Sequence, residues 1–152
     1  MIKITALLSF LLILASCTFV EPEILGMDNI ALDNFEGRVA EFNVTARIKN
    51  DNGYAIKVKP STLDVYVGDQ YMGNIHLDKK IKLKKNQVTT IEAPFTATIA
   101  DGALFKVMTL LSKPSIQIRL TGKVKASVFI ITKKVDVDEK RTIDTSSLKL
   151  GS

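Results

Sequence analysis

Residues 42–49 read Phe-Asn-Val-Thr-Ala-Arg-Ile-Lys, and every second position of this stretch is apolar. The apolar positions are Phe42, Val44, Ala46 and Ile48. In an extended strand these four side chains share one face, because successive side chains point to opposite faces. The stretch therefore predicts a strand with one face in a core and the other in water.

The same alternation recurs outward from this stretch, and turn signals separate its segments. The turns are expected at Asn50–Gly53, Gly68–Gln70 and Asn86–Gln87. Further strands are expected over residues 56–58, 63–67, 71–77, 81–83, 91–99, 116–120 and 124–130, and more weakly over 135–137. Alternation that leaves one face apolar favours antiparallel sheets packed face to face. The sequence predicts an all-β sandwich of about seven strands.

One short helix interrupts the strands. Apolar residues recur at helical spacing at Leu104, Val107, Met108 and Leu111. Asp101 is a suitable N-cap, and Pro114 ends the helix.

Composition is that of one folded domain and excludes several kinds of site. The chain has 152 residues, of which 46% are hydrophobic and 24% charged, with no Trp and a formal net charge of +5. A single Cys excludes an internal disulfide and a four-cysteine zinc site. A single His excludes multi-histidine metal sites, and scattered glycines offer no phosphate-binding loop.

The N-terminus has the organisation of a secretory signal peptide. Lys3 precedes an apolar run of about ten residues, which is too short to cross a bilayer. Leu14-Ala15-Ser16-Cys17 then resembles the lipobox of bacterial lipoproteins. The resemblance implies cleavage between Ser16 and Cys17 and attachment of a diacylglyceryl group to the Cys17 thiol.

These features divide the chain into four segments. We expect a signal peptide over 1–16, a lipidated Cys17 with a short tether over 17–22, a β-sandwich over 23–144 and a polar tail over 145–152. The five residues from Thr18 to Pro22 extend less than about 20 Å, so the domain would lie close to the lipid headgroups. By resemblance to the sorting of enterobacterial lipoproteins, Thr18 in place of Asp implies the outer membrane in a Gram-negative host, on the periplasmic side or at the cell surface.

Three segments carry a resemblance to a family. They are Ala46–Val58 with its Asn-Asp-Asn-Gly turn, Leu63–Gly73 with its tyrosine-bearing hairpin, and Leu120–Val124 with a glycine between two strand segments. Together they resemble the late-embryogenesis-abundant type 2 proteins, which share the water-stress and hypersensitive-response (WHy) domain. Asp51 stands where that family usually has Pro. The resemblance implies an immunoglobulin- or fibronectin III-like sandwich, a role in dehydration or stress protection, and no catalytic residues.

Three groups of residues could carry chemistry, and each also has a plainer interpretation. His76 could act as a general base, but no nucleophile motif accompanies it. Ser146-Ser147-Leu148-Lys149 matches a Ser–Lys catalytic pattern but lies in the polar tail. The acids Asp136, Asp138 and Glu139 suit Ca²⁺, but no glycine-containing loop completes a cage.

Lysines are the most informative charged residues. Lys80, Lys82 and Lys84 would share one face of a strand, and six more lysines occur at positions 57, 59, 123, 125, 133 and 134. Lysines on an edge strand prevent sheet-to-sheet aggregation. They also attract anionic headgroups. Nucleic acid is a third partner class, which the lack of accompanying stacking aromatics disfavours.

The sequence thus predicts a non-enzymatic, lipid-anchored protein of the cell envelope that binds or structures its surroundings, with a link to desiccation. Its partners would be the membrane, through the N-terminal lipid, and an envelope protein or lipid headgroups. No cofactor, metal or nucleic acid is expected. The alternative is a periplasmic carrier or chaperone that binds an apolar ligand or polypeptide between or beside the sheets.

Overall fold

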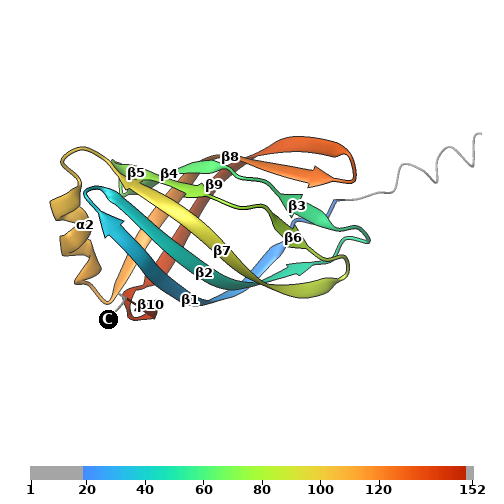
Figure 1. Cartoon of the computed structure of the whole chain (residues 1–152), viewed down its shortest axis with the longest axis horizontal. Helices are drawn as coiled ribbons and strands as arrows, with labels where there is room; N and C mark the ends of the chain where they lie inside the picture. Colours follow the sequence, from blue (N-terminus) through green and yellow to red (C-terminus); the bar gives the residue numbers. More distant parts are fainter. Residues whose placement is uncertain (1–18, 150–152) are drawn as a thin grey trace, which may run out of the picture.

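The computed structural model describes residues 19–149, and for residues 147–149 it describes the backbone alone. The described part is nearly all β-structure (Figure 1). Its strands are β1 (Glu23–Glu36), β2 (Val39–Asn50), β3 (Ile56–Val58), β4 (Thr62–Val67), β5 (Gln70–Leu77), β6 (Ile81–Leu83), β7 (Gln87–Ile99), β8 (Ser115–Val128), β9 (Ile131–Asp144) and β10 (Leu148–Lys149). The helix α2 (Leu104–Leu111) precedes β8, and a 3-10 turn η1 (Thr145–Ser147) precedes β10.

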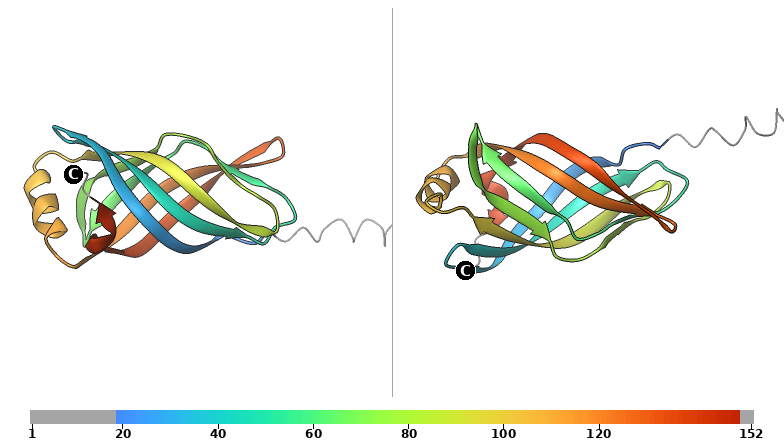
Figure 2. Two further views of the ribbon diagram at one scale, coloured as in Figure 1. Left: turned by 60° about the horizontal axis from the view of Figure 1, so that its bottom comes forward. Right: turned by 90° about the horizontal axis from the view of Figure 1, so that it is seen from above.

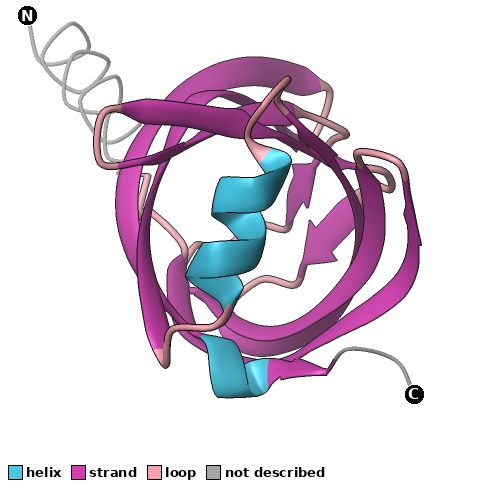
Figure 3. Ribbon diagram, turned by 90° about the vertical axis from the view of Figure 1, so that its left-hand side faces the viewer, coloured by secondary structure: helices cyan, strands magenta, loops and turns pink. Residues whose placement is uncertain are grey.

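The strands form one strongly curved sheet. Its path runs β1-β2-β7-β5-β4-β8 with antiparallel pairing, and β9 pairs the other edge of β8. Beyond the end of β4, β8 pairs β3, which in turn pairs β6, while β10 lies parallel to β1. The sheet curls until its two halves face each other, and α2 lies across one open end (Figures 2 and 3).

This architecture confirms the all-β class with one short helix and is compatible with a sandwich. The strand count differs, because the described residues form ten strands where about seven were expected. The first strand, β1, was not predicted. Its pairing with β2 shifts register between Ile24 and Gly26, between Met27 and Asn29, and between Leu32 and Asn34. Each bulge inserts a residue and breaks the period-two pattern.

A second difference lies between β8 and β9. The expected strand over 124–130 ends at Val128, and Phe129 and Ile130 form a two-residue turn before β9 begins at Ile131. Ile130 was expected on the apolar face of a strand, but its side chain is 98% exposed at the tip of this hairpin.

The core confirms the alternation of residues 42–48. Ala46 is only 5% exposed, and Phe42 stacks on Phe95 of the neighbouring strand β7 at a ring-centroid distance of 5.7 Å. The other buried apolar residues are Ile30, Ile56, Met72, Leu77, Leu83, Ala93, Ile99 and Ala103.

The helix begins and ends close to the expected residues. Asp101 is not its N-cap, because Ala103 occupies that position and the Asp101 carboxylate pairs with Arg38 at 2.5 Å. Val107 packs on the buried cluster under the helix, whereas Met108 is 59% exposed and so does not belong to the buried stripe. The helix ends at Leu111, before Pro114.

Two buried asparagines link the turn after β2 to two other segments. Asn50 is fully buried, and its Nδ2 donates to the carbonyls of Tyr54 (2.9 Å) and Lys84 (3.1 Å). Its Oδ1 accepts from both the backbone N–H and the Nδ2 of Asn52. Asn52 in turn exchanges two hydrogen bonds with Val20, at 2.9 Å and 2.6 Å. We call this network the asparagine clasp; it joins the start of the described chain to the β2–β3 turn.

We expect Asn50→Ala to be strongly destabilising. The substitution leaves the part-buried carbonyls of Tyr54 and Lys84 and the buried N–H of Asn52 without their partner, and each such group costs about 1–3 kcal/mol when it is shielded from water. The free energy of unfolding should fall by about 2–4 kcal/mol. Urea denaturation of the chain that begins at Thr18 measures this, since that chain keeps every contact described above.

Asn34→Ala is the matched control, because Asn34 is an exposed asparagine on β1. Its loss of stability should be below about 0.5 kcal/mol. Equal losses in the two variants would show that the clasp contributes nothing special.

Candidate functional site

The three lysines singled out in the sequence lie along β6 and its flanks. Lys82 is the central residue of β6, and Lys80 and Lys84 lie just outside the strand. All three side chains are exposed, while Leu83 is buried at 2% exposure. This strand is short, so the lysines do not form a long charged stripe by themselves.

The sheet register adds lysines from three other strands to this surface. Lys82 lies directly opposite Lys57 of β3, and Lys57 lies opposite Ser127 of β8. One residue pair further along, the Lys59 N–H donates to the Lys125 carbonyl (2.8 Å). Lys125 lies directly opposite Lys134 of β9.

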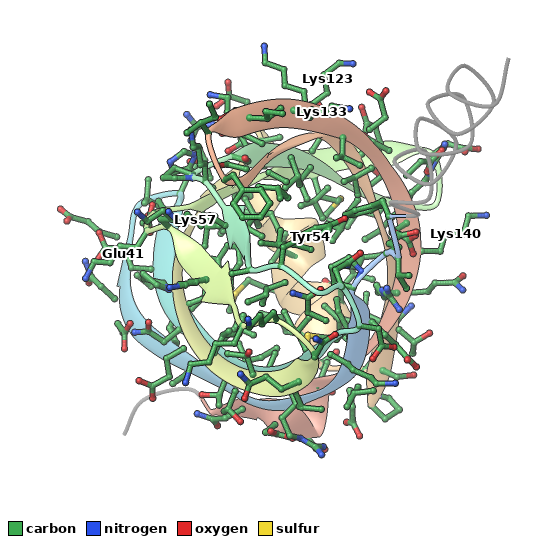
Figure 4. All side chains as sticks on the ribbon, turned by 90° about the vertical axis from the view of Figure 1, so that its right-hand side faces the viewer. Glu41, Tyr54, Lys57, Lys123, Lys133 and Lys140 are labelled. Atoms are coloured by element: carbon green, nitrogen blue, oxygen red, sulfur yellow. The ribbon has the colours of Figure 1, made fainter. Side chains whose placement is uncertain are left out.

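These residues gather at one end of the molecule, which we call the basic end. Figure 4 looks onto it, with Tyr54 near its middle and Lys57, Lys123 and Lys133 toward its rim. Its lysines are Lys57, Lys59, Lys80, Lys82, Lys84, Lys125, Lys133 and Lys134. The sequence supplied the individual residues, but only the pairing of distant strands brings them together.

The positive charge of this end is not neutralised. Among residues 19–149, none of these eight lysines lies within 4.0 Å of a carboxylate. Two nearby acids pair with other lysines, Asp136 with Lys123 (2.6 Å) and Asp51 with Lys49 (2.9 Å), and the contact with Asp51 raises the pKa of Lys49. Like charges directly opposite each other destabilise a sheet. The pairs Lys57–Lys82 and Lys125–Lys134 therefore cost stability in the isolated protein.

The start of the described chain lies at the same end. The asparagine clasp fixes Val20 beside the β2–β3 turn, next to β3 and β6. Figures 1 and 2 show this entry point and the tip of the β8–β9 hairpin at the same end, with α2 at the opposite one. Ser16 and Cys17, the predicted cleavage and lipidation residues, lie outside the described residues.

His76 does not form part of a catalytic set. It is half-buried on β5 opposite Thr62 of β4, and its Nδ1 lies 2.8 Å from Thr62 Oγ1. Among the described residues no carboxylate hydrogen-bonds this imidazole. In the part of the chain that the structure describes, the Thr62–His76 pair therefore lacks a third group that would orient the imidazole as a base.

The acidic cluster on β9 is divided among cations. Asp136 pairs with Lys123 and Glu139 with Arg141, and Arg119 donates two hydrogen bonds of 2.7 Å to Asp138. These bonds from Arg119 hold the pKa of Asp138 below its usual range. Within residues 19–149 no group of three His, Cys, Asp or Glu side chains is placed to hold a metal ion.

The Ser146–Lys149 pattern falls on η1 and β10. The exposed Ser146 donates its backbone N–H to Asp144 (2.9 Å), and the side chain of Lys149 lies outside the described residues. Hydrogen bonds from the side chain and the backbone of Ser146 hold the pKa of Asp144 below its usual range.

An apolar pocket lies under α2, at the end opposite the lysines. Its volume is about 140 Å³, below the roughly 300 Å³ at which ligand pockets begin. Its lining residues are Val65, Val67, Met72, Val107, Leu110, Leu111, Ile116 and Ile118. In the described part of the chain, no helix has the length and apolarity needed to span a bilayer.

Fold and surface together define a class of protein: a curved antiparallel β-domain with a basic end and an apolar interior. Residues 45–141 match the model of the late embryogenesis abundant protein family LEA_2. The chain therefore belongs to this family, as its Asn-Asp-Asn-Gly turn and its strand pattern indicate. No curated protein matches the chain in sequence.

Solved structures agree with the fold. A protein from Archaeoglobus fulgidus, known from a crystal structure, is 10% identical, with a TM-score of 0.52 over 80% of this chain and 97% of that one. At this identity the likeness concerns the fold alone. A protein from Arabidopsis thaliana, known from a solution structure, is also 10% identical, with a TM-score of 0.44 over 86% of this chain and 87% of that one.

We expect Lys82→Glu to stabilise the protein. The new carboxylate would lie opposite Lys57 and replace a repulsive cross-strand pair with an attractive one, a change of about 0.5–1 kcal/mol at low salt. About 1 M NaCl should remove most of the gain, because it shortens the Debye length to about 3 Å. Thermal or urea unfolding at the two salt concentrations measures the effect.

Lys79→Glu is the control with the same change in net charge. Lys79 is exposed in the loop between β5 and β6 and has no cross-strand partner. If both variants gained the same stability, the effect would come from net charge and the register-opposed lysines would be irrelevant.

Proposed function

We propose that this LEA_2 protein is a non-enzymatic binding and structural module of the cell envelope, anchored by a lipid on Cys17. The asparagine clasp is the observation that carries this proposal. It fixes Val20, so only the short segment between Cys17 and Val20 is left as a tether. Three residues extend at most about 10 Å, half the reach that the sequence alone suggests. A lipid on Cys17 would thus hold the basic end against the headgroups.

The charge of that end suits such a position. Each lysine close to an anionic membrane surface contributes about 1 kcal/mol of attraction. The unpaired lysines would then be stabilised by the membrane, whereas in solution they repel each other. A single acyl chain gives only marginal anchoring, so surface contacts and the further acyl chains of a lipoprotein act in the same direction.

A non-enzymatic role is supported by the arrangement of the reactive side chains. His76 hydrogen-bonds a threonine hydroxyl, and the three acids of the β9 cluster, Asp136, Asp138 and Glu139, are engaged by basic side chains. A binding role therefore fits the arrangement of these side chains better than a catalytic role does.

The alternative of a carrier for an apolar ligand is less well supported. The pocket under α2 is too small for such a ligand, and its lining includes Met72 of the buried cluster. The outer edge of β9 also makes a poor site for adding a partner strand, because eight of its fourteen residues are charged.

Membership of the LEA_2 family supports a link to water stress. A folded domain held at the headgroups would replace lost water there with lysine and backbone hydrogen-bonding groups. We infer that the protein protects the envelope during drying.

Anchoring is tested by Cys17→Ser expressed in a lipoprotein-producing bacterium. We expect the natural protein to fractionate with membranes and to yield an N-terminal Cys17 peptide whose mass includes the diacylglyceryl group. The variant should lack the modification and remain uncut before residue 17. An unmodified, uncut N-terminus in the natural protein would refute the anchor.

The protective role is tested by comparing survival after drying in a strain that lacks the gene and in its parent. We expect lower survival without the gene and recovery by the natural gene but not by Cys17→Ser. Equal survival of all the strains would remove the stress role and leave the anchor unaffected.

A further inference from the structure

The tip of the β8–β9 hairpin is apolar and almost fully exposed. Phe129 is 79% exposed, Ile130 98% and Ile131 60%. Three consecutive large apolar side chains in water are unfavourable, because burial of each would contribute substantially to stability. The neighbouring Tyr54 ring contacts only one side of the Phe129 ring, at a centroid distance of 6.1 Å.

The turn itself does not call for these residues. A two-residue hairpin turn in which only the first residue has a positive φ favours Gly at that position. Here Phe129 has a φ of +53°, a conformation that bulky side chains rarely adopt. Neither local turn geometry nor packing within the described chain explains why Phe and Ile occupy this tip.

Cations surround the tip on both of its strands. Lys125 and Lys134 face each other across the hairpin, and Lys133 lies opposite Ala126. On the adjoining strand Lys57 lies opposite Ser127, and Lys59 donates its Nζ to Thr132 Oγ1 at 2.8 Å. An apolar tip flanked by lysines complements an anionic bilayer, in which the phosphates lie at the surface and the acyl chains lie deeper.

The opposite end of the molecule lacks this combination. Phe105 and Met108 are also exposed there, on the outer face of α2, but among the described residues no two lysines lie directly opposite each other at that end. Exposed apolar side chains alone therefore do not distinguish the two ends, whereas the lysines that face each other across strands beside the tip do.

We propose that the β8–β9 hairpin tip inserts Phe129 and Ile130 into the interface of an anionic phospholipid bilayer while the surrounding lysines contact headgroup phosphates. The hairpin is then a second membrane attachment, distinct from the lipid. The inference deepens the proposed function but does not need Cys17 to be lipidated, since the contact belongs to the folded domain.

The test uses the chain that begins at Thr18, which has no lipidation site and keeps all the described strands. Its binding is measured by co-sedimentation with vesicles of phosphatidylglycerol and phosphatidylethanolamine, and with vesicles of phosphatidylcholine alone. We expect binding to the anionic vesicles at least tenfold tighter than to phosphatidylcholine, and weaker at high salt. Equal binding to both, or to neither, would overturn the proposal, and a protein partner for this surface would then be the remaining explanation.

The decisive variant is Phe129→Gly combined with Ile130→Asn. It places the preferred turn residues at the tip, so the hairpin should remain at least as stable, as urea unfolding can verify. Binding to anionic vesicles should fall at least tenfold. Phe105→Asn removes an equally exposed ring at the α2 end and should leave binding unchanged. Undiminished binding of the double variant would overturn insertion.

The lysines are tested by Lys125→Gln with Lys134→Gln against Lys106→Gln with Lys113→Gln. Both pairs remove two charges, but only the first lies beside the tip. We expect the first pair to weaken binding about tenfold or more and the second to have little effect. Equal effects would show attraction by net charge alone and would contradict a defined docking surface.

Insertion has a direct spectroscopic readout, because the chain contains no Trp. Ile130→Trp provides a single fluorophore at the tip, and Phe105→Trp provides one at the other end. On addition of anionic vesicles the emission of Trp at 130 should shift to shorter wavelength and be quenched by brominated acyl chains, while Trp at 105 should be unaffected. No shift at 130 would contradict insertion whatever the state of Cys17.

Discussion

The asparagine clasp is the constraint on which the rest of the molecule depends. Two buried amide side chains satisfy backbone groups that the curled sheet leaves unpaired where β2, β6 and the chain entry meet. A buried polar network of this kind is stabilising only when every member has its partner, which makes it specific as well as strong. It also determines which end of the domain carries the N-terminal segment, and therefore which surface a membrane anchor would present to lipid.

How much of the fold could be predicted from the sequence depended on whether a feature arises from neighbouring residues or from residues far apart in the chain. The alternation of residues 42–48 is local, and Ala46 and Phe42 lie where it places them. The strand β1 was not predicted, because three bulges shift its alternation of apolar and polar residues out of phase. The alternation also predicted a strand that continues to Ile130, where the chain in fact turns. The turn was missed because Phe129-Ile130 carries no turn signal.

The functional surface was predictable only in part. Lysines at 80, 82 and 84 were recognised from their spacing, but their association with Lys57, Lys125 and Lys134 arises from the register of strands far apart in sequence. The clasp was equally inaccessible, since its turn resembled an ordinary Asn-Gly reversal. What the sequence could not show was that Asn52 holds Val20, a residue 32 positions away.

The bonds between Asn52 and Val20 also define how the domain would respond to a pull on its first residues. Force applied there would load these two hydrogen bonds before any strand of the sheet. If these two bonds broke while the sheet stayed intact, the tether from Cys17 to the folded part would lengthen from about 10 Å to nearly 20 Å. The domain could then tilt or rise without unfolding. Local release of this kind needs far less energy than global unfolding. In a chain anchored at Cys17, the same two bonds would make the spacing between the domain and the membrane adjustable in two steps.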